Sequence, residues 1–79
     1  MKLRRDLSGR ALVKHLCSHW SYVQVHQSGS HIIVETEDPT HQRMAIPDHD
    51  TLRIGTLHNI VRAVSQHKGV SREQLLDEL

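Results

Sequence analysis

The chain has 79 residues, 37% of them hydrophobic and 24% charged, with a formal net charge of +1. This balance is typical of one globular domain, residues 1–79, and excludes a disordered chain. No apolar run approaches the ~20 residues that cross a bilayer, and the basic start is not followed by the apolar stretch of an ordinary signal peptide. The single cysteine, Cys17, has no partner for an internal disulfide, so we expect a cytoplasmic protein without a membrane partner.

The charge is distributed unevenly along the chain. Residues 1–20 hold five basic residues and one acidic residue, whereas residues 21–50 hold one basic residue and five acidic ones. A basic end on a nearly neutral protein is compatible with phosphate contacts, although such segments are more often solvated surface. The candidate phosphate contacts here are Arg4, Arg5 and Arg10.

The first predicted element is a helix over residues 8–17. Its apolar residues fall on one arc, and Ser8 fits the N-cap position. His15 and His19 are spaced four residues apart, which is half of a metal site, but no further ligands follow at a recognisable spacing. We therefore interpret both as structural residues and predict no metal and no cofactor.

The apolar pattern then changes to a period of two, which indicates β-strands. Three strands are predicted, at residues 22–26, 31–36 and 42–46, with turns at 27–30 and 37–40. Val23 and Val25 share one face of the first strand. Strands joined by such short turns form an antiparallel meander.

The last third of the sequence predicts two helices. Apolar residues recur at helical spacing from residue 57 to residue 64, with Thr56 as the candidate N-cap and Gly69 as the end. Ser71 opens a capping box for a short final helix. The order α-β-β-β-α-α is an α+β fold. Each main helix has one apolar stripe, so both should cover the same sheet face and leave the other open.

Several motifs occur in a characteristic order. Gly29-Ser30-His31 begins the second strand, followed by Met44-Ala45-Ile46-Pro47-Asp48-His49, Ile54-Gly55-Thr56-Leu57 and Gly69-Val70-Ser71-Arg72-Glu73. No single motif is specific, but the ordered set resembles the HicA-type mRNA interferase toxins (the YcfA-like family) over nearly the whole chain. The resemblance implies a fold like that of double-stranded-RNA-binding domains. It also implies cleavage of single-stranded mRNA, a catalytic histidine at His31 and neutralisation by a HicB-type antitoxin.

The chemistry of RNA suits a lone histidine at His31. RNA carries its own nucleophile, the 2′-hydroxyl, so cleavage needs a proton acceptor rather than a metal. Imidazole, with an unperturbed pKa of ~6.5, is the side chain best matched to that task near neutral pH. Gly29 lets the backbone approach a phosphate, and Ser30 adds a hydroxyl and an N–H donor. Taken locally, the same residues also fit an ordinary hairpin turn and a surface histidine.

Further candidates surround this motif. His26, near the end of the first strand, is the candidate for a second active-site imidazole, with a solvent-facing strand residue as the alternative. Arg43 is a further candidate RNA contact. Trp20 and Tyr22 are the aromatic residues available for stacking on bases, and Trp20 is better interpreted as core.

The remaining histidines carry weaker signals. His49 lies between Asp48 and Asp50, where a carboxylate–imidazole pair and a polar loop are both compatible with the sequence. His41, His58 and His67 have no visible partner in the sequence and are interpreted as surface residues.

Two other classes of function remain open. A non-catalytic RNA-binding module of the same fold would read double-stranded RNA by shape, through basic residues in the first helix and at the start of the last one. Gly55-Thr56-Leu57 stands where such a module has a lysine cluster, which argues against it. A purely structural interaction protein would have no affinity for RNA at any salt concentration.

Overall fold

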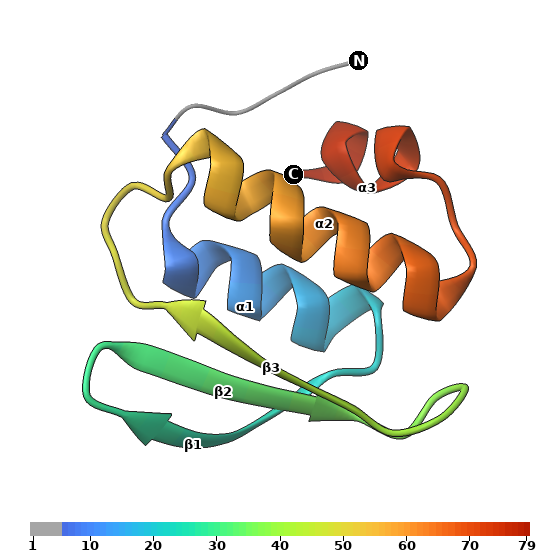
Figure 1. The fold of residues 1–79 in the computed structure, drawn as a ribbon, viewed down its shortest axis with the longest axis horizontal. Coiled ribbons are helices and arrows are strands. Elements are labelled where there is room, and N and C mark those ends of the chain that lie inside the picture. The colour runs from blue at the N-terminus through green and yellow to red at the C-terminus, as the bar shows by residue number, and fades with distance from the viewer. Residues whose placement is uncertain (1–5) are drawn as a thin grey trace.

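The computed structural model describes residues 6–79, so the candidate RNA contacts Arg4 and Arg5 lie outside the described residues. Within residues 6–79 the elements follow the expected order. They are α1 (Gly9–His19), β1 (Val23–Ser28), β2 (His31–Thr36), β3 (Gln42–Pro47), α2 (Ile54–Lys68) and α3 (Arg72–Glu78). The strands form one antiparallel sheet in the order β1-β2-β3, which confirms the α+β class and the meander (Figure 1).

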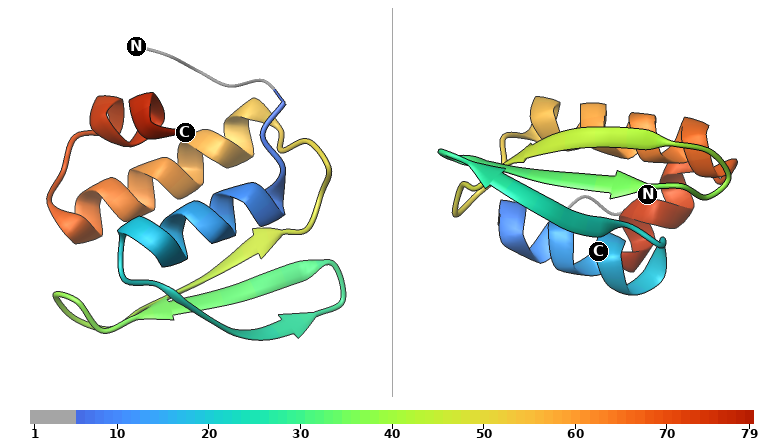
Figure 2. Two further views of the ribbon diagram at one scale, coloured as in Figure 1. Left: turned by 180° about the vertical axis from the view of Figure 1, so that it is seen from behind. Right: turned by 90° about the horizontal axis from the view of Figure 1, so that it is seen from below.

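The three helices all lie on one side of this sheet. Figure 1 shows α1 nearest to the strands and α3 farthest from them. Seen from below, in the right-hand view of Figure 2, the strands lie in front of the helices, and no helix crosses the near face of the sheet. We call this uncovered side the open face. No helix in the described part of the chain is both long enough and apolar enough to span a membrane.

The core lies between the sheet and the helices. Ile32 and Val34 on β2 belong to this core, and Thr36 is buried on the same side. Ile33, on the open face between them, is 9% exposed and lies outside the core cluster. Aliphatic side chains fill most of this core, as expected from a chain with one tryptophan, one tyrosine and no phenylalanine. The most completely buried are Leu12, Leu16, Val34, Ile46, Leu57 and Val64.

Strand β1 is exposed along its whole length, and a register shift interrupts it between Gln24 and His26. Val23 and Val25 are 60% and 48% exposed and line one shallow depression with Glu35, which lies on the open face. The bulge adds one residue to β1, and this extra residue brings His26 to the same face as Val23. The open face of β1 therefore carries an imidazole as well as two valines.

The helix ends agree with the sequence in three places and differ in one. Ser8 and Ser71 accept hydrogen bonds from the N–H groups of Ala11 and Gln74, both at 3.0 Å, which confirms the two predicted N-caps. Gly69 ends α2 in the left-handed conformation, at φ 71°. The prediction of Thr56 as an N-cap was wrong: α2 begins at Ile54, so Thr56 lies inside its first turn.

Gly9 is the point where α1 touches the end of β3. Its N–H donates to the carbonyl of His49 at 2.9 Å. A Cβ atom added at Gly9 would lie 1.8 Å from the carbonyl oxygen of Pro47, which is backbone and cannot rotate away. Only glycine therefore allows this approach of helix and strand.

We predict that Gly9→Ala lowers the free energy of unfolding by about 2 kcal/mol or more, because the methyl group forces α1 away from β3. Gly55→Ala is the matched control: Gly55 is also in the first turn of a helix, but an added Cβ there meets nothing within 4 Å. It should leave the free energy of unfolding unchanged or raise it by up to about 1 kcal/mol. Urea denaturation of both variants would measure the difference. Equal stabilities would contradict the contact.

Candidate functional site

His31 is the first residue of β2, the central strand, and its side chain is exposed. In the sheet register it lies opposite Ser28 on β1 and Pro47 on β3. The next residue, Ile32, is buried in the core, so alternation directs the side chain of His31 to the open face. The imidazole is therefore accessible to solvent on the face that no helix covers.

Gly29 and Ser30 form the two-residue turn that precedes His31. Gly29 has φ 59°, in the left-handed region that two-residue hairpin turns require. The carbonyl of Ser30 accepts a hydrogen bond from the N–H of Asp48 at 2.7 Å. The turn that carries the motif is thus bound to the loop that follows β3.

Asp48 also binds through its side chain. Its carboxylate accepts two hydrogen bonds from Arg10, from Nε at 2.9 Å and from Nη2 at 3.0 Å, and a third from Nε2 of Gln27 at 3.1 Å. These bonds from Arg10, followed by its positive charge, lower the pKa of Asp48, and the same pair raises the pKa of Arg10. We call Asp48, Arg10 and Gln27 the Asp48 cluster. No local sequence pattern predicts this cluster, because its members are 17 or more residues apart.

The structure brings some of the predicted site residues together and separates another. Arg10, whose side chain is 73% exposed, lies at the same end of the sheet as Gly29-Ser30-His31 because both are bound to Asp48. It lies on the helix-covered side, however, where it lines a hollow with Gln27 and Ile32. Arg43 is on the open face but lies opposite Glu35, four residues along β2 from His31, which is ~13 Å. It forms an ion pair with Glu35 at 3.3 Å. Arg43 therefore belongs to the other end of the sheet.

His26 lies near His31 but not directly opposite it. Its register partner is Ile33, so it is the diagonal neighbour of His31 on the same face. Diagonal neighbours in an antiparallel pair are ~7–8 Å apart, a separation that one phosphodiester can bridge. The two interpretations of His26, as a second imidazole and as a solvent-facing strand residue, are both compatible with this position.

The aromatic residues are not on the open face. Tyr22 is only 2% exposed, and burial raises its pKa to about 12. The prediction that Tyr22 is available to stack on bases was therefore wrong. Trp20 packs against the core, as expected, and its indole N–H donates to Glu78 at 3.0 Å.

The other histidines have structural surroundings. His15 is half-buried, lies 3.1 Å from the carboxylate of Glu78 and stacks on His19, which supports the structural interpretation of this pair. His67 was expected to lack a partner, but its Nε2 is 2.8 Å from the carbonyl oxygen of Thr40. Such a pairing across 27 residues cannot be seen in the sequence.

His49 makes its contact to α1 through its backbone. Its carbonyl accepts the N–H of Gly9, and the ring is exposed. The neighbouring Asp48 gives both carboxylate oxygens to Arg10. A carboxylate–imidazole pair between Asp48 and His49 is therefore not the arrangement found, and the polar-loop interpretation of His49 fits better.

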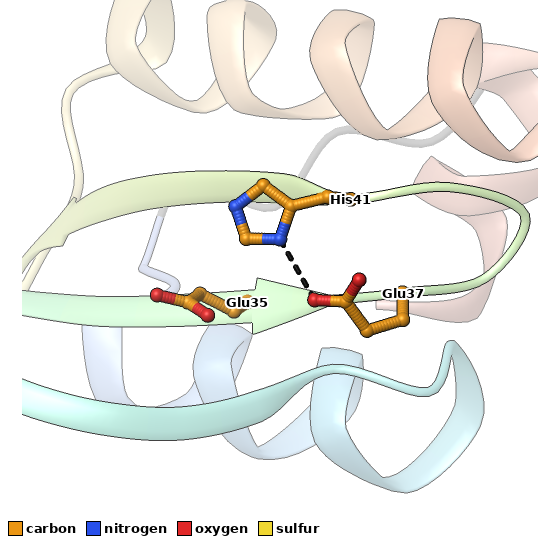
Figure 3. A group of neighbouring side chains, drawn as sticks. All are labelled: Glu35, Glu37 and His41. Atoms are coloured by element: carbon orange, nitrogen blue, oxygen red, sulfur yellow. Dashed lines mark hydrogen bonds and ion pairs between the residues drawn. The ribbon is translucent and has the colours of Figure 1, made fainter.

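A second polar group lies at the opposite end of β2. Glu37 and His41 are hydrogen-bonded at 2.7 Å, with Glu35 beside them (Figure 3). The potential ligand atoms of these three side chains lie within 4.8 Å of one another. They are therefore the candidate cation ligands among residues 6–79. Arg43 already pairs with Glu35. His41 was expected to have no partner, but its hydrogen bond to the Glu37 carboxylate and the negative charge of Glu37 raise the pKa of His41.

Comparison of the chain with protein-family models, with curated proteins and with solved structures found no match. A function therefore has to be argued from the residues themselves. The strongest arrangement in the described chain is the end of the sheet at His31, where an exposed imidazole follows a glycine turn that is bound to the loop after β3. The polar residues at the other end of β2 instead pair with one another, Glu37 with His41 and Glu35 with Arg43.

The lowered pKa of Asp48 predicts a pH-dependent contribution to stability. As the pH falls below 3.8, the usual pKa of this carboxyl group, Asp48 becomes protonated in the unfolded state while it is still ionised in the folded state. The carboxylate therefore stabilises the fold above about pH 4, and this contribution is lost as the pH falls through the lower value of the folded state. Asp48→Asn should be less stable than the wild-type chain at pH 7, with the difference shrinking at pH 2.5.

Urea denaturation of both proteins at the two pH values measures this difference. Asp50→Asn, an exposed position two residues farther along the same loop, controls for the general loss of a loop carboxylate and should change stability less at pH 7. A difference between wild type and Asp48→Asn that stays constant down to pH 2.5 would rule out the ion pair as its source.

Proposed function

We propose that this chain is an mRNA interferase of the HicA type, a metal-independent endoribonuclease with His31 as its proton-transfer residue. The observation that carries the proposal is the exposed imidazole at the start of the central strand, on the sheet face that no helix covers. The sequence resemblance around Gly29-Ser30-His31 supports it independently. A fold of the double-stranded-RNA-binding-domain type is part of the same proposal, and the α-β-β-β-α order is compatible with it.

Each group at this end of the sheet has a task in RNA cleavage. His31 removes the proton from the 2′-hydroxyl, whose oxygen then attacks the adjacent phosphorus. The 5′-oxygen leaves and takes up a proton. Positioned acid–base catalysis of this kind contributes typically ~10²–10⁴-fold in rate. The N–H and hydroxyl groups of Ser30 would bind the phosphate oxygens, on which negative charge develops.

The second proton transfer has two candidate donors. His26, the diagonal neighbour of His31, could protonate the leaving oxygen while His31 acts as the base. Alternatively, His31 performs both transfers in turn, and His26 only faces solvent. If His31 performs both transfers, a variant without His26 should cleave at nearly the wild-type rate. If the two histidines form an acid–base pair, the wild-type chain should show a bell-shaped dependence of rate on pH, and the variant without His26 should not.

The partners follow from the same proposal. The substrate is single-stranded mRNA, which places the activity in the cytoplasm. A HicB-type antitoxin would neutralise the enzyme by covering the open face at His31. That face is accessible to a protein because neither α1 nor α2 crosses it.

The non-catalytic RNA-binding module remains the alternative. The start of α2 carries Arg53 and then Ile54-Gly55-Thr56, without the lysine cluster expected of a shape-reading module. A gel of labelled single-stranded RNA separates the two functions, because an enzyme produces fragments and a module only shifts the intact band.

We predict that His31→Ala reduces the rate of RNA cleavage by about 10²-fold or more, because the proton acceptor is lost, and leaves the circular dichroism spectrum unchanged. His41→Ala is the matched control: it removes another exposed histidine from the far end of β2 and should cleave at the wild-type rate. Cleavage by purified His31→Ala at the wild-type rate would refute the proposal.

We also predict that cleavage persists in EDTA and leaves 2′,3′-cyclic phosphate ends, because the attacking group is the 2′-hydroxyl rather than water. Mass spectrometry of the fragments identifies these ends. An RNA with 2′-O-methyl groups, which lacks the nucleophile, is the control and should not be cut. Fragments with 5′-phosphates, formed only with a divalent ion, would disprove the mechanism.

A further inference from the structure

Strand β1 forms an accessible edge of the sheet. Among residues 6–79 it pairs with β2 alone, and all six of its residues are exposed. In Figure 1 it is the lower border of the described chain, with no helix or strand beyond it. The outward N–H and C=O groups of such a strand are a template on which a further strand can pair.

The edge at β1 also lacks the residues that usually protect an edge. Proteins commonly place charged side chains or proline on edge strands, and residues 23–28 contain no lysine, arginine, carboxylate or proline. The opposite edge strand, β3, carries Arg43 and ends at Pro47. The bulge between Gln24 and His26 interrupts the regular ladder, so β1 can pair with a short segment rather than a long strand.

On the open face, the hollow beside β1 is apolar where it meets the strand. Val23 and Val25 line it, and they are two of the three exposed large hydrophobic side chains in residues 6–79. Covering them removes apolar surface from water, which stabilises a complex by ~25 cal/mol for each Å². Glu35 and Glu37 line the same hollow and disfavour a further carboxylate there. Side chains of an added strand on this face should therefore be aliphatic.

On the helix-covered side, a second hollow between α1 and β1 carries basic residues. Arg10 and Lys14, one turn apart on α1, line it together with Gln24 and Gln27. Asp48 occupies two N–H groups of Arg10, which leaves three of its five donors. Lys14 is exposed and pairs with no carboxylate of the described residues. Side chains of an added strand on this side should therefore be acidic.

We propose that β1 binds a short extended protein segment in which aliphatic and acidic residues alternate, added to the sheet as a fourth strand. Successive side chains of a strand point to opposite faces, so the aliphatic ones cover Val23 and Val25 while the acidic ones approach Arg10 and Lys14. Main-chain hydrogen bonds to the edge supply affinity, and the two hollows supply selectivity. This surface is the edge of the sheet, and the proposal does not rest on the proposed ribonuclease function.

A second copy of this chain is a poorer occupant of the same edge. Antiparallel pairing of two β1 strands in one continuous sheet places both α1 helices on the same side of it, so the basic residues of the two helices face each other across the junction. Like charges placed opposite each other across an interface cost affinity. An acidic segment has the opposite effect.

The experiment is an NMR titration of the isotope-labelled chain with capped five-residue peptides. The probe alternates valine with glutamate, and the control alternates valine with lysine. The glutamate peptide should shift the amide signals of residues 23–28 and slow their hydrogen exchange, because outward N–H groups become hydrogen-bonded. The lysine peptide should bind about 10-fold more weakly. Equal affinities would overturn the proposal.

N-methylated peptides test whether the segment pairs through its main chain. Two versions of the glutamate peptide, methylated at the valine or at the glutamate nitrogens, differ in which edge of the peptide has lost its N–H groups. The version whose methyl groups face β1 should not bind. If both versions bind as tightly as the unmodified peptide, strand addition is ruled out.

A charge reversal tests the assignment of the basic hollow. Lys14→Glu should weaken binding of the glutamate peptide about 10-fold and strengthen binding of the lysine peptide. Arg62→Glu is the matched control, because it makes the same change in net charge at an exposed position of α2 that does not line the hollow. It should stay within about two-fold of wild type for both peptides. Equal effects of the two variants would show unspecific charge attraction and overturn the proposal.

Sedimentation velocity of the free chain tests the other occupant. The chain should remain monomeric at the concentrations used for the titration. A dimer that Val25→Lys dissociates, in a chain that binds neither peptide, would identify a second copy as the occupant and overturn the proposal.

Discussion

The close approach of α1 to the end of β3 is the constraint on which the rest of the structure depends. Gly9 lets the helix backbone touch the carbonyl of Pro47, and its N–H binds His49 in the loop beyond. One residue later, Arg10 reaches Asp48 in the same loop. The contact therefore fixes which end of the sheet lies beside the start of the helix, and this is the end where β2 begins.

This arrangement leaves the two ends of the sheet with different charge. At the His31 end, the exposed guanidinium of Arg10 covers a carboxylate that is mostly shielded from solvent. At the other end Glu35 pairs with Arg43, and Glu37 pairs with His41. The two ends of the sheet therefore differ in their electrostatic surroundings for a charged ligand.

The elements of the fold could be predicted from periodicity because each one carries its own local pattern. The caps at Ser8 and Ser71 are local in the same sense, since each bonds to an N–H three residues away. Long-range relations were not accessible in this way. The hydroxyl of the buried Tyr22 donates to Gln42, 20 residues away, and Asp48 binds residues 21 and 38 positions away. Neither pairing has a signature in the chain.

At the candidate site, too, the local features could be predicted from the sequence and the long-range ones could not. A motif such as Gly29-Ser30-His31 is contiguous, so the sequence places its turn and imidazole together without knowledge of the fold. Whether that imidazole faces the helices or solvent depends on which alternate residues of β2 point toward the helices. Ile32 does so, and His31 next to it therefore faces the other way. A shift of one residue would have turned His31 into the core and Ile32 outward. The hairpin register, fixed by a two-residue turn that the backbone of Asp48 binds, therefore determines whether this chain presents an accessible imidazole at this position.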